Sequence, residues 1–502
     1  MNYKPVAVVT ASEARERDAR AIASGISSRT LMHNAGVAAA AEIVRLLKEL
    51  DGSGVQIHVG PGNNGGDGWV VAGELARLGF PVGVVEAGEA RTRDALDAKA
   101  DARRRAFTAF EGNPAIVVDA LLGTGSRGSL SGAILDAVRS INSARKNGAR
   151  IVALDMPTGV DATTGMHDEC VQADLTLTFG TLKRGHLIAR SACGEIRVLD
   201  IGLGDSGSAG SNDLVLASPD WISEHIPRIR ADAHKGTRKR LAIVAGDEGM
   251  AGAAILAGQA ALRSGIGLLH LIVARANREA VHCAVPAALV STHDEFENDA
   301  MRVLNGADAV VVGPGLHPEN ARKLLAALSG SKVRALLDAG ALSDDRESLR
   351  KFCSSRNVIL TPHPAEMGRM RGVETAEVLE RRFEIGAELA GDTGATVLLK
   401  GTPTVVSDPR GKRFVTATGT PALATGGSGD LLSGIIGTLF AQTGESLESA
   451  VCGAWVHGRA AELCGTARGV TLEDILFAMP AAWNIPQHSP SAPVLATLPA
   501  VQ

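Results

Sequence analysis

Residues 55–68 read VQIHVGPGNNGGDG, an apolar run that leads into a glycine-rich loop. A strand that passes through glycines into a helix is the opening unit of a parallel, doubly wound sheet. Gly60, Gly62 and Gly65 also have the G-x-G-x-x-G spacing of a dinucleotide-binding loop. Glu86 ends the next apolar run, about where the ribose-binding acid of such a loop is expected. The stretch therefore raises the question whether it binds a nicotinamide cofactor for hydride transfer or another ligand.

Strand-like and helix-like segments alternate on both sides of this stretch. Thr10 and Glu13 have the spacing of a capping box, which predicts a helix that runs toward Ser24. Further helical patterns cover 32–50 and 69–78. Short apolar runs, each followed by a turn signal, are VQIHVG, PVGVVEA, AIVVDALLG, RIVALDMP and DLTLTFG. This rhythm predicts an α/β domain over 1–210, a Rossmann-like αβα sandwich.

A Gly/Ser-rich segment, 202–213, interrupts the alternation and reads as a linker. The alternation then restarts in KRLAIVAGD, LLHLIVA, ADAVVVGPG, VRALLDAG, NVILTPHP and ATVLLKG. A hairpin is expected around the turn residues 408–411. The Pro/Ser/Ala-rich tail after Pro486 is expected to fray. We therefore predict a second αβα domain over 220–490.

The composition limits the classes of function. A chain of 502 residues is long enough for two or three domains. A net charge of −4 and 3% aromatic residues argue against a nucleic-acid partner. We find no secretory h-region and no apolar run of membrane-spanning length, so no membrane association is expected. Six scattered cysteines without a C-x-x-C pair indicate free thiols in a reducing cytoplasm.

Charged side chains follow the strand runs of the first half. Asp119 and Asp155 end apolar runs, Lys183 follows another, and Asp67 follows the opening loop. Because the carboxyl ends of parallel strands share one edge of the sheet, these groups are expected to converge there. Lys183 is then a cationic or proton-transfer partner for the carboxylates. The alternative for each aspartate is a helix cap or a turn residue, and Asp67 in particular reads as an N-cap.

The opening loop is unlike a pyrophosphate cradle in one respect. Asp67 would repel a pyrophosphate unless a cation lay between them. Asn63 and Asn64 supply amide oxygens, and oxygen-rich loops suit a hard cation. The residues therefore favour a cation beside the loop.

The second half carries ATGGSGD, residues 424–430, directly before a helical run. Its glycines and the helix N-terminus form an anion hole, and Asp430 is positioned to accept a proton from a hydroxyl that is being phosphorylated. No Lys-Ser/Thr pair follows the glycines, so this is not a Walker loop. The alternatives are a tight helix start for this motif, a loop histidine for His363 and a solvated charge for Lys400.

The motifs GPGNNGGDG, DALLGTG, DMPTGVDATTG and TFGTLKRG together resemble the N-terminal epimerase domain of the NAD(P)H-hydrate repair enzymes, over about residues 10–205. The resemblance implies a potassium ion bound by Asn64, Asp119 and Thr158, where the family usually has Ser at the last position. It implies that Asp155 and Lys183 form the acid/base pair. The implied contacts to the hydrated dinucleotide are Asn63, Asn64, Gly65, Gly66, Asp67, Gly123, Thr124, Gly125, Ser126, Arg127, Gly128, Ser129 and Asp155.

The second half resembles the ribokinase-like superfamily. More narrowly, HKGT, GMAGAA, GPGL, TPHPAE, KGTPT and ATGGSGD are similar to the dehydratase domain of the same repair system, over about residues 225–480. The resemblance implies use of ADP with Mg²⁺ and a catalytic role for Asp430. Ser428 and the stretch 421–424 depart from the family's usual residues. The implied ADP contacts are Lys400, Gly401, Thr402, Pro403, Thr404 and Gly429, and the implied hydrate contacts are Ala253, Gly315, His363 and Asp430.

Three hypotheses follow. The chain is a bifunctional enzyme that acts on NADHX and NADPHX, with a homo-oligomer expected. Alternatively, it is a vitamin or sugar kinase with an accessory nucleotide-binding domain. In the third hypothesis the first half only binds a nucleotide or a partner protein, and the second half alone is active.

Overall fold

The computed structural model describes residues 5–50, 54–105, 107–110, 112–126, 128–210, 213–293, 299–343, 345–485 and 493–501. These residues form two compact units. The first unit holds the described residues up to Val215 together with the C-terminal stretch 493–501, and the second unit holds the described residues from Leu216 to Ile485. None of the described helices is long and apolar enough to span a bilayer.

The first unit is built around a mostly parallel sheet with the strand order β19-β8-β6-β5-β4-β2-β3. Six of its strands run parallel. The central strands β4 and β5 are buried along almost their whole length, as expected for strands covered on both faces. Outside this sheet, β1 pairs in parallel with β7 and antiparallel with β9. The strands are β1 (Ala7–Val9), β2 (Val55–Val59), β3 (Val82–Glu86), β4 (Ile116–Ala120), β5 (Arg150–Leu154), β6 (Leu175–Phe179), β7 (Leu182–Lys183), β8 (Glu195–Leu199), β9 (Leu214–Leu216) and β19 (Val494–Leu498).

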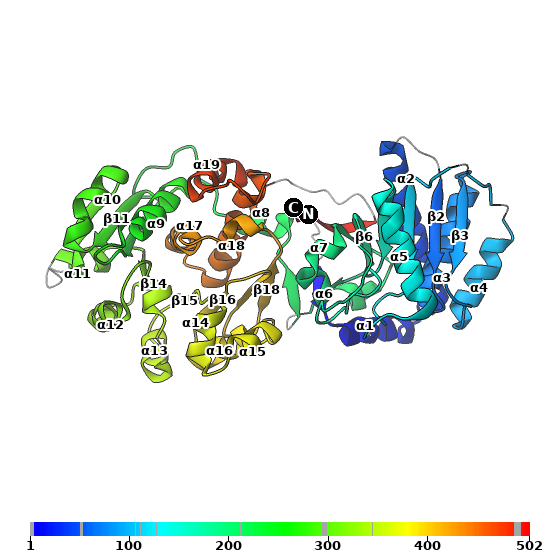
Figure 1. Cartoon of the computed structure of the whole chain (residues 1–502). Helices are drawn as coiled ribbons and strands as arrows, with labels where there is room; N and C mark the ends of the chain where they lie inside the picture. Colours follow the sequence, from blue (N-terminus) through cyan, green and yellow to red (C-terminus); the bar gives the residue numbers. More distant parts are fainter. Residues whose placement is uncertain are drawn as a thin grey trace. The chain divides into compact units, whose positions relative to one another are not determined.

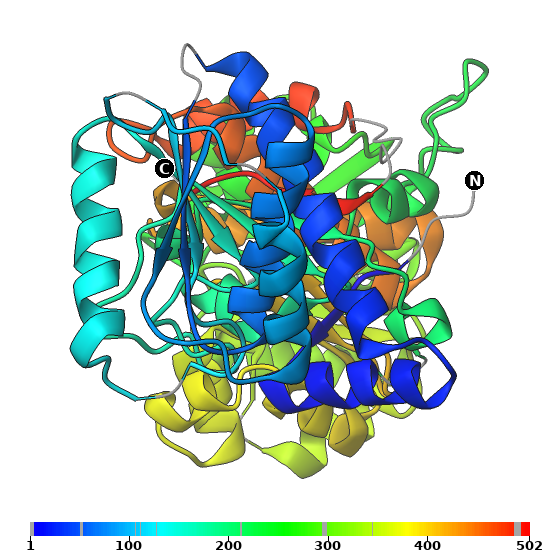
Figure 2. The same cartoon turned by 90° about the vertical axis from the view of Figure 1, so that its right-hand side faces the viewer.

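Helices cover both faces of this sheet. Figure 2 shows the blue helices of residues 28–77 on one side of the sheet and the cyan helix α5 on the other. Each face has its own apolar core, one around Ile43, Trp69 and Leu75 and the other around Val138 and Ile141. The helices are α1 (Ala11–Ala23), α2 (Ser28–Glu49), α3 (Asn63–Arg77), α4 (Arg93–Arg103), α5 (Gly132–Lys146), α6 (Arg184–Ile188) and α7 (Arg190–Cys193).

The second unit repeats the layered plan with the strand order β12-β11-β10-β13-β14-β15-β16-β17-β18. Strands β10 to β16 run parallel, and β17 and β18 join antiparallel. The strands are β10 (Arg240–Val244), β11 (Leu268–Val273), β12 (Leu289–Thr292), β13 (Ala309–Val312), β14 (Arg334–Leu337), β15 (Val358–Leu360), β16 (Thr396–Leu399), β17 (Thr404–Ser407) and β18 (Arg413–Thr416).

Within this unit, Figure 1 shows α17 and α18 above β14 to β16, and α12 to α16 below these strands. Helix α17 packs closely against α9 and α18. The helices are α8 (Pro219–His225), α9 (Ala251–Arg263), α10 (Arg278–Ala284), α11 (Asp299–Asn305), α12 (Pro318–Ala327), α13 (Arg346–Cys353), α14 (Pro364–Arg371), α15 (Thr375–Glu380), α16 (Ile385–Thr393), α17 (Ser428–Thr443), α18 (Ser446–Leu463) and α19 (Leu472–Ala482).

In each unit the chain leaves its first parallel strand on one side and later returns to the other side of it. The crevice between β2 and β4, and that between β10 and β13, therefore lie at the point where the strand order reverses. Ligands of doubly wound sheets bind at such points, beyond the carboxyl ends of the strands.

The structure confirms the predicted capping box and hairpin, but it differs from the predicted helix 69–78 and from the predicted C-terminal tail. The capping box of Thr10 and Glu13 and the β17–β18 hairpin are confirmed. The helix predicted over 69–78 begins at Asn63, so the glycine loop itself supplies the first turns of α3. The expected fraying of the tail is wrong for 494–498, because this alternating stretch pairs antiparallel with the edge strand β8.

Candidate active sites

The loops after β2, β4 and β5 of the first unit meet around a cavity of about 460 Å³. It is lined by eight of the predicted site residues, and Asp18, Arg15 and Asp94 are among its other charged neighbours. The predicted residues that line it are Asn63, Asn64, Asp67, Gly123, Thr124, Gly125, Asp155 and Lys183. The carboxyl ends of separate strands therefore bring together half of the predicted first site.

Other predicted contacts lie elsewhere among the described residues. Gly65 and Gly66 are buried within α3, and Ser126 is buried with a hydroxyl that has no hydrogen-bond partner in the described structure. Ser129 donates a hydrogen bond from Oγ to Asp168 Oδ2 at 3.0 Å. Gly128 adopts a positive φ of 70°, and Arg127 lies outside the described residues.

The glycines of the opening loop serve packing as well as ligand access. A Cβ atom at Gly60 would lie 1.9 Å from the Leu121 carbonyl oxygen, and one at Gly65 would lie 1.9 Å from the Gly60 carbonyl oxygen. By contrast, a Cβ atom at Gly62 would meet nothing within 4 Å. Two of the three glycines in the G-x-G-x-x-G pattern are therefore required because another part of the backbone passes close to them.

Glu86 does not line the cavity. Its carboxylate forms ion pairs with Lys99 and with Arg103, the latter at 2.7 Å, and both cations come from α4. Asp67, in contrast, lies inside α3, whose N-cap is Gly62, so the interpretation of Asp67 as an N-cap is wrong. Asn63, Asn64 and Asp67, which are not part of the dinucleotide-binding pattern, thus line the cavity. Glu86, the acidic residue of that pattern, forms ion pairs at the surface instead.

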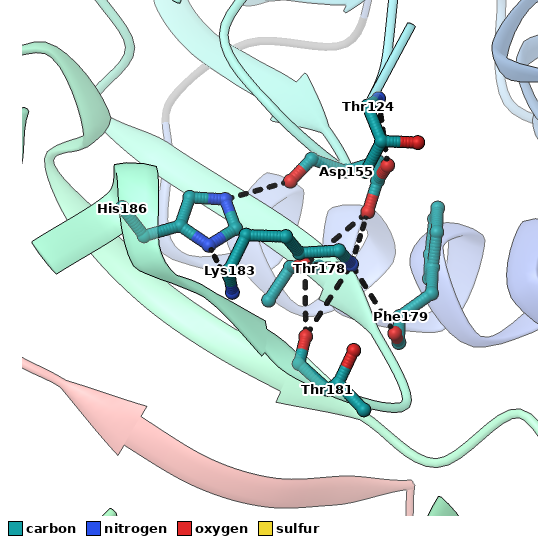
Figure 3. A network of polar contacts seen from close by, with 7 residues as sticks. All are labelled: Thr124, Asp155, Thr178, Phe179, Thr181, Lys183 and His186. Atoms are coloured by element: carbon teal, nitrogen blue, oxygen red, sulfur yellow. Dashed lines mark hydrogen bonds and ion pairs between the residues drawn. The ribbon is translucent and has the colours of Figure 1, made fainter. Parts of the chain in front are cut away.

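Asp155 and Lys183 form the centre of the polar network in Figure 3. Lys183 Nζ lies 2.6 Å from Asp155 Oδ1 and donates to Thr178 Oγ1 at 2.8 Å. The Thr124 N–H donates to the other carboxylate oxygen, Asp155 Oδ2, at 3.2 Å. Burial alone would raise the pKa of Asp155, but Lys183 and these hydrogen bonds hold it below its usual value. The Asp155 carboxyl is therefore ionised at neutral pH.

The backbone at Asp155 is strained, and a histidine holds it in place. Asp155 has φ 64°, and the Met156 N–H donates to the Leu154 carbonyl across it at 2.8 Å. His186 Nδ1 accepts from the Lys183 N–H at 3.1 Å, so the proton sits on Nε2, which donates to the Asp155 carbonyl at 2.8 Å. Burial and Lys183 lower the pKa of His186 to about 3, which keeps the ring neutral. This arrangement fixes the two reactive side chains relative to each other.

Behind the cavity, Asp119 and Thr158 form a second buried group. Asp119 Oδ1 accepts from the Thr158 hydroxyl at 2.8 Å, and Oδ2 accepts from the Thr158 N–H at 2.8 Å. Burial raises the pKa of Asp119 to about 6, although the Thr158 hydrogen bonds lower it in part. Asn64 lines the cavity and is 8% exposed, and neither its amide oxygen nor its amide nitrogen has a hydrogen-bond partner in the described structure.

Carboxylates outnumber cations in this cavity. Burial raises the pKa of Asp67 well above its usual range, and the charges of Asp155 and Asp18 raise it further. Asp18, on α1, was not singled out by the sequence reasoning because nothing local distinguishes it from a solvated helix face. Thr178 and His186 were missed as well, although both lie in or beside the TFGTLKRG motif.

In the second unit, Lys400 is the centre of a group that gathers at the ends of β14, β15 and β16. Lys400 Nζ lies 2.8 Å from Asp338 Oδ1 and 3.9 Å from Glu366 Oε2. Ser433 of α17 donates from Oγ to Asp338 Oδ2 at 2.7 Å. Burial would lower the pKa of Lys400, but Asp338 and Glu366 raise it above its usual value. Lys400 is therefore a firmly charged group.

The N-terminus of α17 points into this group. The helix begins at Ser428 after Gly427, which has φ 94°. A Cβ atom at Gly429 would lie 3.5 Å from Lys400 Nζ, so the loop closely approaches the cation. Burial and the charge of Asp338 together raise the pKa of Asp430 to about 6, against the opposing effect of Lys400. The positive end of the α17 dipole and a charged lysine beside the Asp430 carboxyl suit a phosphate in transfer.

His363 caps the neighbouring helix α14. Its Nδ1 accepts from the Ala365 and Glu366 N–H groups at 3.2 and 3.3 Å, which leaves the proton on Nε2 at 3.3 Å from Glu366 Oε1. Burial lowers the pKa of His363. The interpretation of His363 as an ordinary loop histidine is therefore incomplete, since it joins the electrostatic group around Lys400.

The remaining predicted residues lie at the start of α9, in the loops after β13 and β16, and at the start of β17. A Cβ atom at Gly315 would lie 2.7 Å from the Ala253 Cβ, so these two predicted contacts are neighbours. In the loop after β16, Thr404 Oγ1 donates to the Gly401 carbonyl at 3.0 Å, and Arg382 donates to the Thr402 carbonyl at 2.6 Å. The Thr402–Pro403 peptide is cis.

One central residue of the second site was missed. Asp338 is 2% exposed and links Lys400 to Ser433. Asp338 follows the apolar run VRALL, just as Asp119 and Asp155 follow theirs. This position at the end of a predicted strand could have identified it as a site residue. The unusual Ser428 keeps a structural use for its hydroxyl, which donates to the Leu423 carbonyl at 2.8 Å.

Comparison with known proteins matches both halves of the chain. The family model described as YjeF-related protein N-terminus matches residues 28–185, and the family model described as NAD(P)H-hydrate dehydratase matches residues 241–479. A solved structure of the ADP/ATP-dependent NAD(P)H-hydrate dehydratase from Bacillus subtilis, co-crystallised with ATP and Mg²⁺, has a TM-score of 0.48 and 28% identity. That similarity covers 53% of this chain and 97% of the Bacillus chain.

Full-length relatives extend the match across the two units. The bifunctional NAD(P)H-hydrate repair enzyme Nnr of Moorella thermoacetica is 33% identical over 92% of this chain and 93% of its own. The enzyme of the same name from Escherichia coli is 35% identical over 83% of this chain and 82% of its own. With the two layered sheets, these matches confirm the expected α/β class and favour the repair enzyme over the kinase alternative. The chain belongs to the family of bifunctional NAD(P)H-hydrate repair enzymes, with an epimerase-type first half and a dehydratase-type second half.

Proposed function

We propose that this protein repairs hydrated NADH and NADPH in two reactions. The first unit interconverts the R and S forms of NADHX and NADPHX. The second unit dehydrates the S form at the expense of ADP and releases AMP and phosphate. The observation that carries the proposal is that each unit gathers its own charged centre at the strand ends, Asp155 with Lys183 in one and Lys400 with Asp430 in the other.

In the first unit we assign proton transfer to Asp155, with Lys183 as the charged partner that orients it. The hydrate carries a hydroxyl on the carbon next to the ring nitrogen, and epimerisation requires a proton to reach and leave that hydroxyl. The ionised Asp155 is held in a fixed orientation by Thr124 and Lys183, which preorganises it for this work. The assigned contacts to the dinucleotide are Asn63 to Asp67, Gly123 to Ser129 and Asp155.

A potassium ion fits the group of Asn64, Asp119 and Thr158. The buried Asn64 amide oxygen has no hydrogen-bond partner in the described structure, and the other two residues offer a carboxylate and a hydroxyl. Oxygen donors of this kind suit a hard cation. The ion would offset the charge of the buried carboxylates beside the substrate phosphates.

In the second unit we assign the base to Asp430. Phosphorylation of the hydrate's hydroxyl turns it into a good leaving group, and Asp430 accepts the hydroxyl proton at that step. Lys400 and the N-terminus of α17 stabilise the transferred phosphate's charge. Ala253, Gly315 and His363 contact the hydrate, while 400–404 and Gly429 contact ADP.

A magnesium ion fits this second site as a companion of the nucleotide. Among the described residues no group of three or more His, Cys, Asp and Glu side chains is arranged to hold a metal. Mg²⁺ usually keeps several waters and binds substrate phosphates with one or two carboxylates. The ion would supply charge neutralisation for the nucleotide phosphates. We further propose that the chain acts in the cytoplasm, whose reducing conditions suit its free cysteines.

The test is an assay with a mixture of both hydrate epimers, Mg²⁺ and either ADP or ATP. Recovery of the near-UV absorbance of the reduced nicotinamide ring, for both epimers, is expected with release of free phosphate. A stable phosphorylated product, detected by mass spectrometry, would instead support a kinase. Recovery limited to the S epimer would leave the first unit with a binding role only.

A further inference from the structure

Helix α1 presents a carboxylate, Asp18, to the first cavity. The helix is anchored at its start by the capping box of Thr10 and Glu13. It is anchored in its middle by Arg17, which donates to the Ser206 carbonyl at 2.8 Å and pairs with Asp213 at 2.5 Å. Asp18 follows Arg17 directly, and it lines the same cavity as Asp155 and Lys183. A fixed helix therefore holds this carboxyl at the reaction site.

The charge balance of the cavity leaves Asp18 without a dedicated cation. Lys183 is committed to Asp155 at 2.6 Å, and Arg17 is committed to Asp213. In the described part of the chain, neither Asp18 nor Asp67 has an ion-pair partner. Arg15 and Asp94 also line the cavity, one with each sign of charge. Partial burial raises the pKa of Asp18, Lys183 lowers it in part and Asp155 raises it again.

Epimerisation needs two proton-handling groups. The hydroxyl of the R form and that of the S form leave from opposite faces of the same ring carbon. One group must protonate the departing hydroxyl while another accepts a proton from the water that adds to the other face. Asp155, paired with Lys183, is ionised and suited to accept a proton. A second, protonated group is required for the donor role.

We propose that Asp18 is a catalytic acid–base residue of the epimerase site. The inference rests on the function proposed above. The Asp18 carboxyl gives its proton to the hydroxyl oxygen as the carbon–oxygen bond breaks, and the bond's electron pair leaves with the water. The lone pair of the ring nitrogen forms the carbon–nitrogen double bond. Water then adds to the opposite face, that double bond's electrons return to nitrogen, and the excess proton passes to Asp155.

The positions of the three carboxyl groups favour Asp18 as the donor. Lys183 would leave the buried charge of Asp155 unpaired if it gave up its proton. Asp67 lies within α3, and desolvation raises its pKa well above its usual range, so it gives up a proton less readily. The Asp18 side chain lines the cavity but also remains open to solvent, so solvent can take the proton from Asp155 and return one to Asp18 after each turnover. Net change is limited to the configuration of the ring carbon.

The test compares Asp18→Asn with Glu16→Gln, a control two residues away on the same helix. Glu16 does not line the cavity, and its carboxylate accepts from Ser12 at 3.3 Å. Conversion of the pure R hydrate, without ADP, is followed by chromatography against a blank without enzyme. In D18N, kcat is expected to fall about 10²- to 10⁴-fold with KM unchanged, as for loss of a general acid. Glu16→Gln should match the wild type, and Asp18→Glu should restore part of the rate.

The pH profile separates this role from a structural one. The donor must be protonated, so wild-type kcat for epimerisation falls as pH rises through the pKa of Asp18, and this falling limb should vanish in Asp18→Asn. Dehydration of the S hydrate with ADP should be unchanged. Wild-type kcat with the falling limb intact in D18N overturns the inference alone. An absence of epimerisation in the wild-type protein overturns the proposed function instead.

Discussion

Lys183 Nζ lies 2.6 Å from Asp155 Oδ1, and the two side chains are 3% and 14% exposed. The same distance separates Arg139 Nη2 from Glu169 Oε1, but those side chains are 58% and 53% exposed. Removal of one partner from a buried pair leaves an uncompensated charge in a poorly hydrated place. An exposed pair loses little, because water solvates the remaining charge. Burial therefore separates two ion pairs of the same length.

Asp155→Asn is expected to destabilise the first unit and to stop epimerisation. The change leaves Lys183 without its partner, at a cost of about 3–5 kcal/mol for a buried pair. Thermal unfolding and conversion of the R hydrate measure the two effects, and use of the S hydrate should be spared. Glu169→Gln is the matched control and should change neither. Equal rates for both epimers in D155N would favour a binding role for the first unit.

Asn64→Ala is expected to remove a potassium-dependent stabilisation of the first unit. The Asn64 amide is buried without a partner, so it gains a contact only when a cation binds. The melting temperature of the wild-type protein should be higher in KCl than in NaCl at equal ionic strength. Asn63→Ala, at the exposed neighbour, should keep that difference. A wild-type protein that is indifferent to the cation would contradict the assignment.

Asp430 is expected to govern the acid side of the dehydration profile. Burial raises its pKa to about 6, and the base must be ionised to accept a proton. The kcat for the S hydrate should therefore fall as pH drops through about 6. Asp430→Asn should lose about 10²- to 10⁴-fold in kcat at neutral pH. Glu473→Gln, on the exposed face of α19, should keep the wild-type profile, and a pH-independent rate in the wild type would exclude Asp430 as the base.

Glu86→Ala is expected to leave epimerisation intact. The Glu86 carboxylate pairs with Lys99 and Arg103 on α4 and does not line the cavity. A dinucleotide site of the fingerprint type would use this acid on a ribose. The KM of the R hydrate in E86A should equal the wild-type value. A large rise in KM would revive the fingerprint interpretation of the opening loop.

The parts of the site that could be predicted from sequence are those with a local signature. Asp119 and Asp155 each end an apolar run, and the parallel sheet then brings them to one edge. Asp338 also ends an apolar run, but it was not predicted as a site residue because no recognisable motif surrounds it. Asp18 had no such signature, since its role depends on where α1 packs. A helical periodicity gives a face but does not say which site that face meets.

The C-terminal strand was missed for a similar reason. Pro, Ser and Ala surround VLATL, and composition dominates a prediction of order at chain ends. The partner of this strand, β8, lies almost three hundred residues away in sequence, and only the edge of the finished sheet shows the vacancy that it fills. Strand pairing between segments that are far apart in sequence produces no recognisable pattern within either segment.

Removal of 493–502 is expected to impair the first unit and to spare the second. Strand β19 covers the edge of β8 with register pairs from Val494–Leu199 to Leu498–Ile196, and Arg190 donates to the Pro499 carbonyl. Loss of this strand exposes the unpaired backbone groups of β8, which favours aggregation. Epimerisation of the R hydrate should fall and light scattering should rise, while dehydration of the S hydrate continues. A shorter deletion of 500–502 is the control, because it keeps every β19 pair, and full epimerisation in the longer deletion would show that the strand is dispensable.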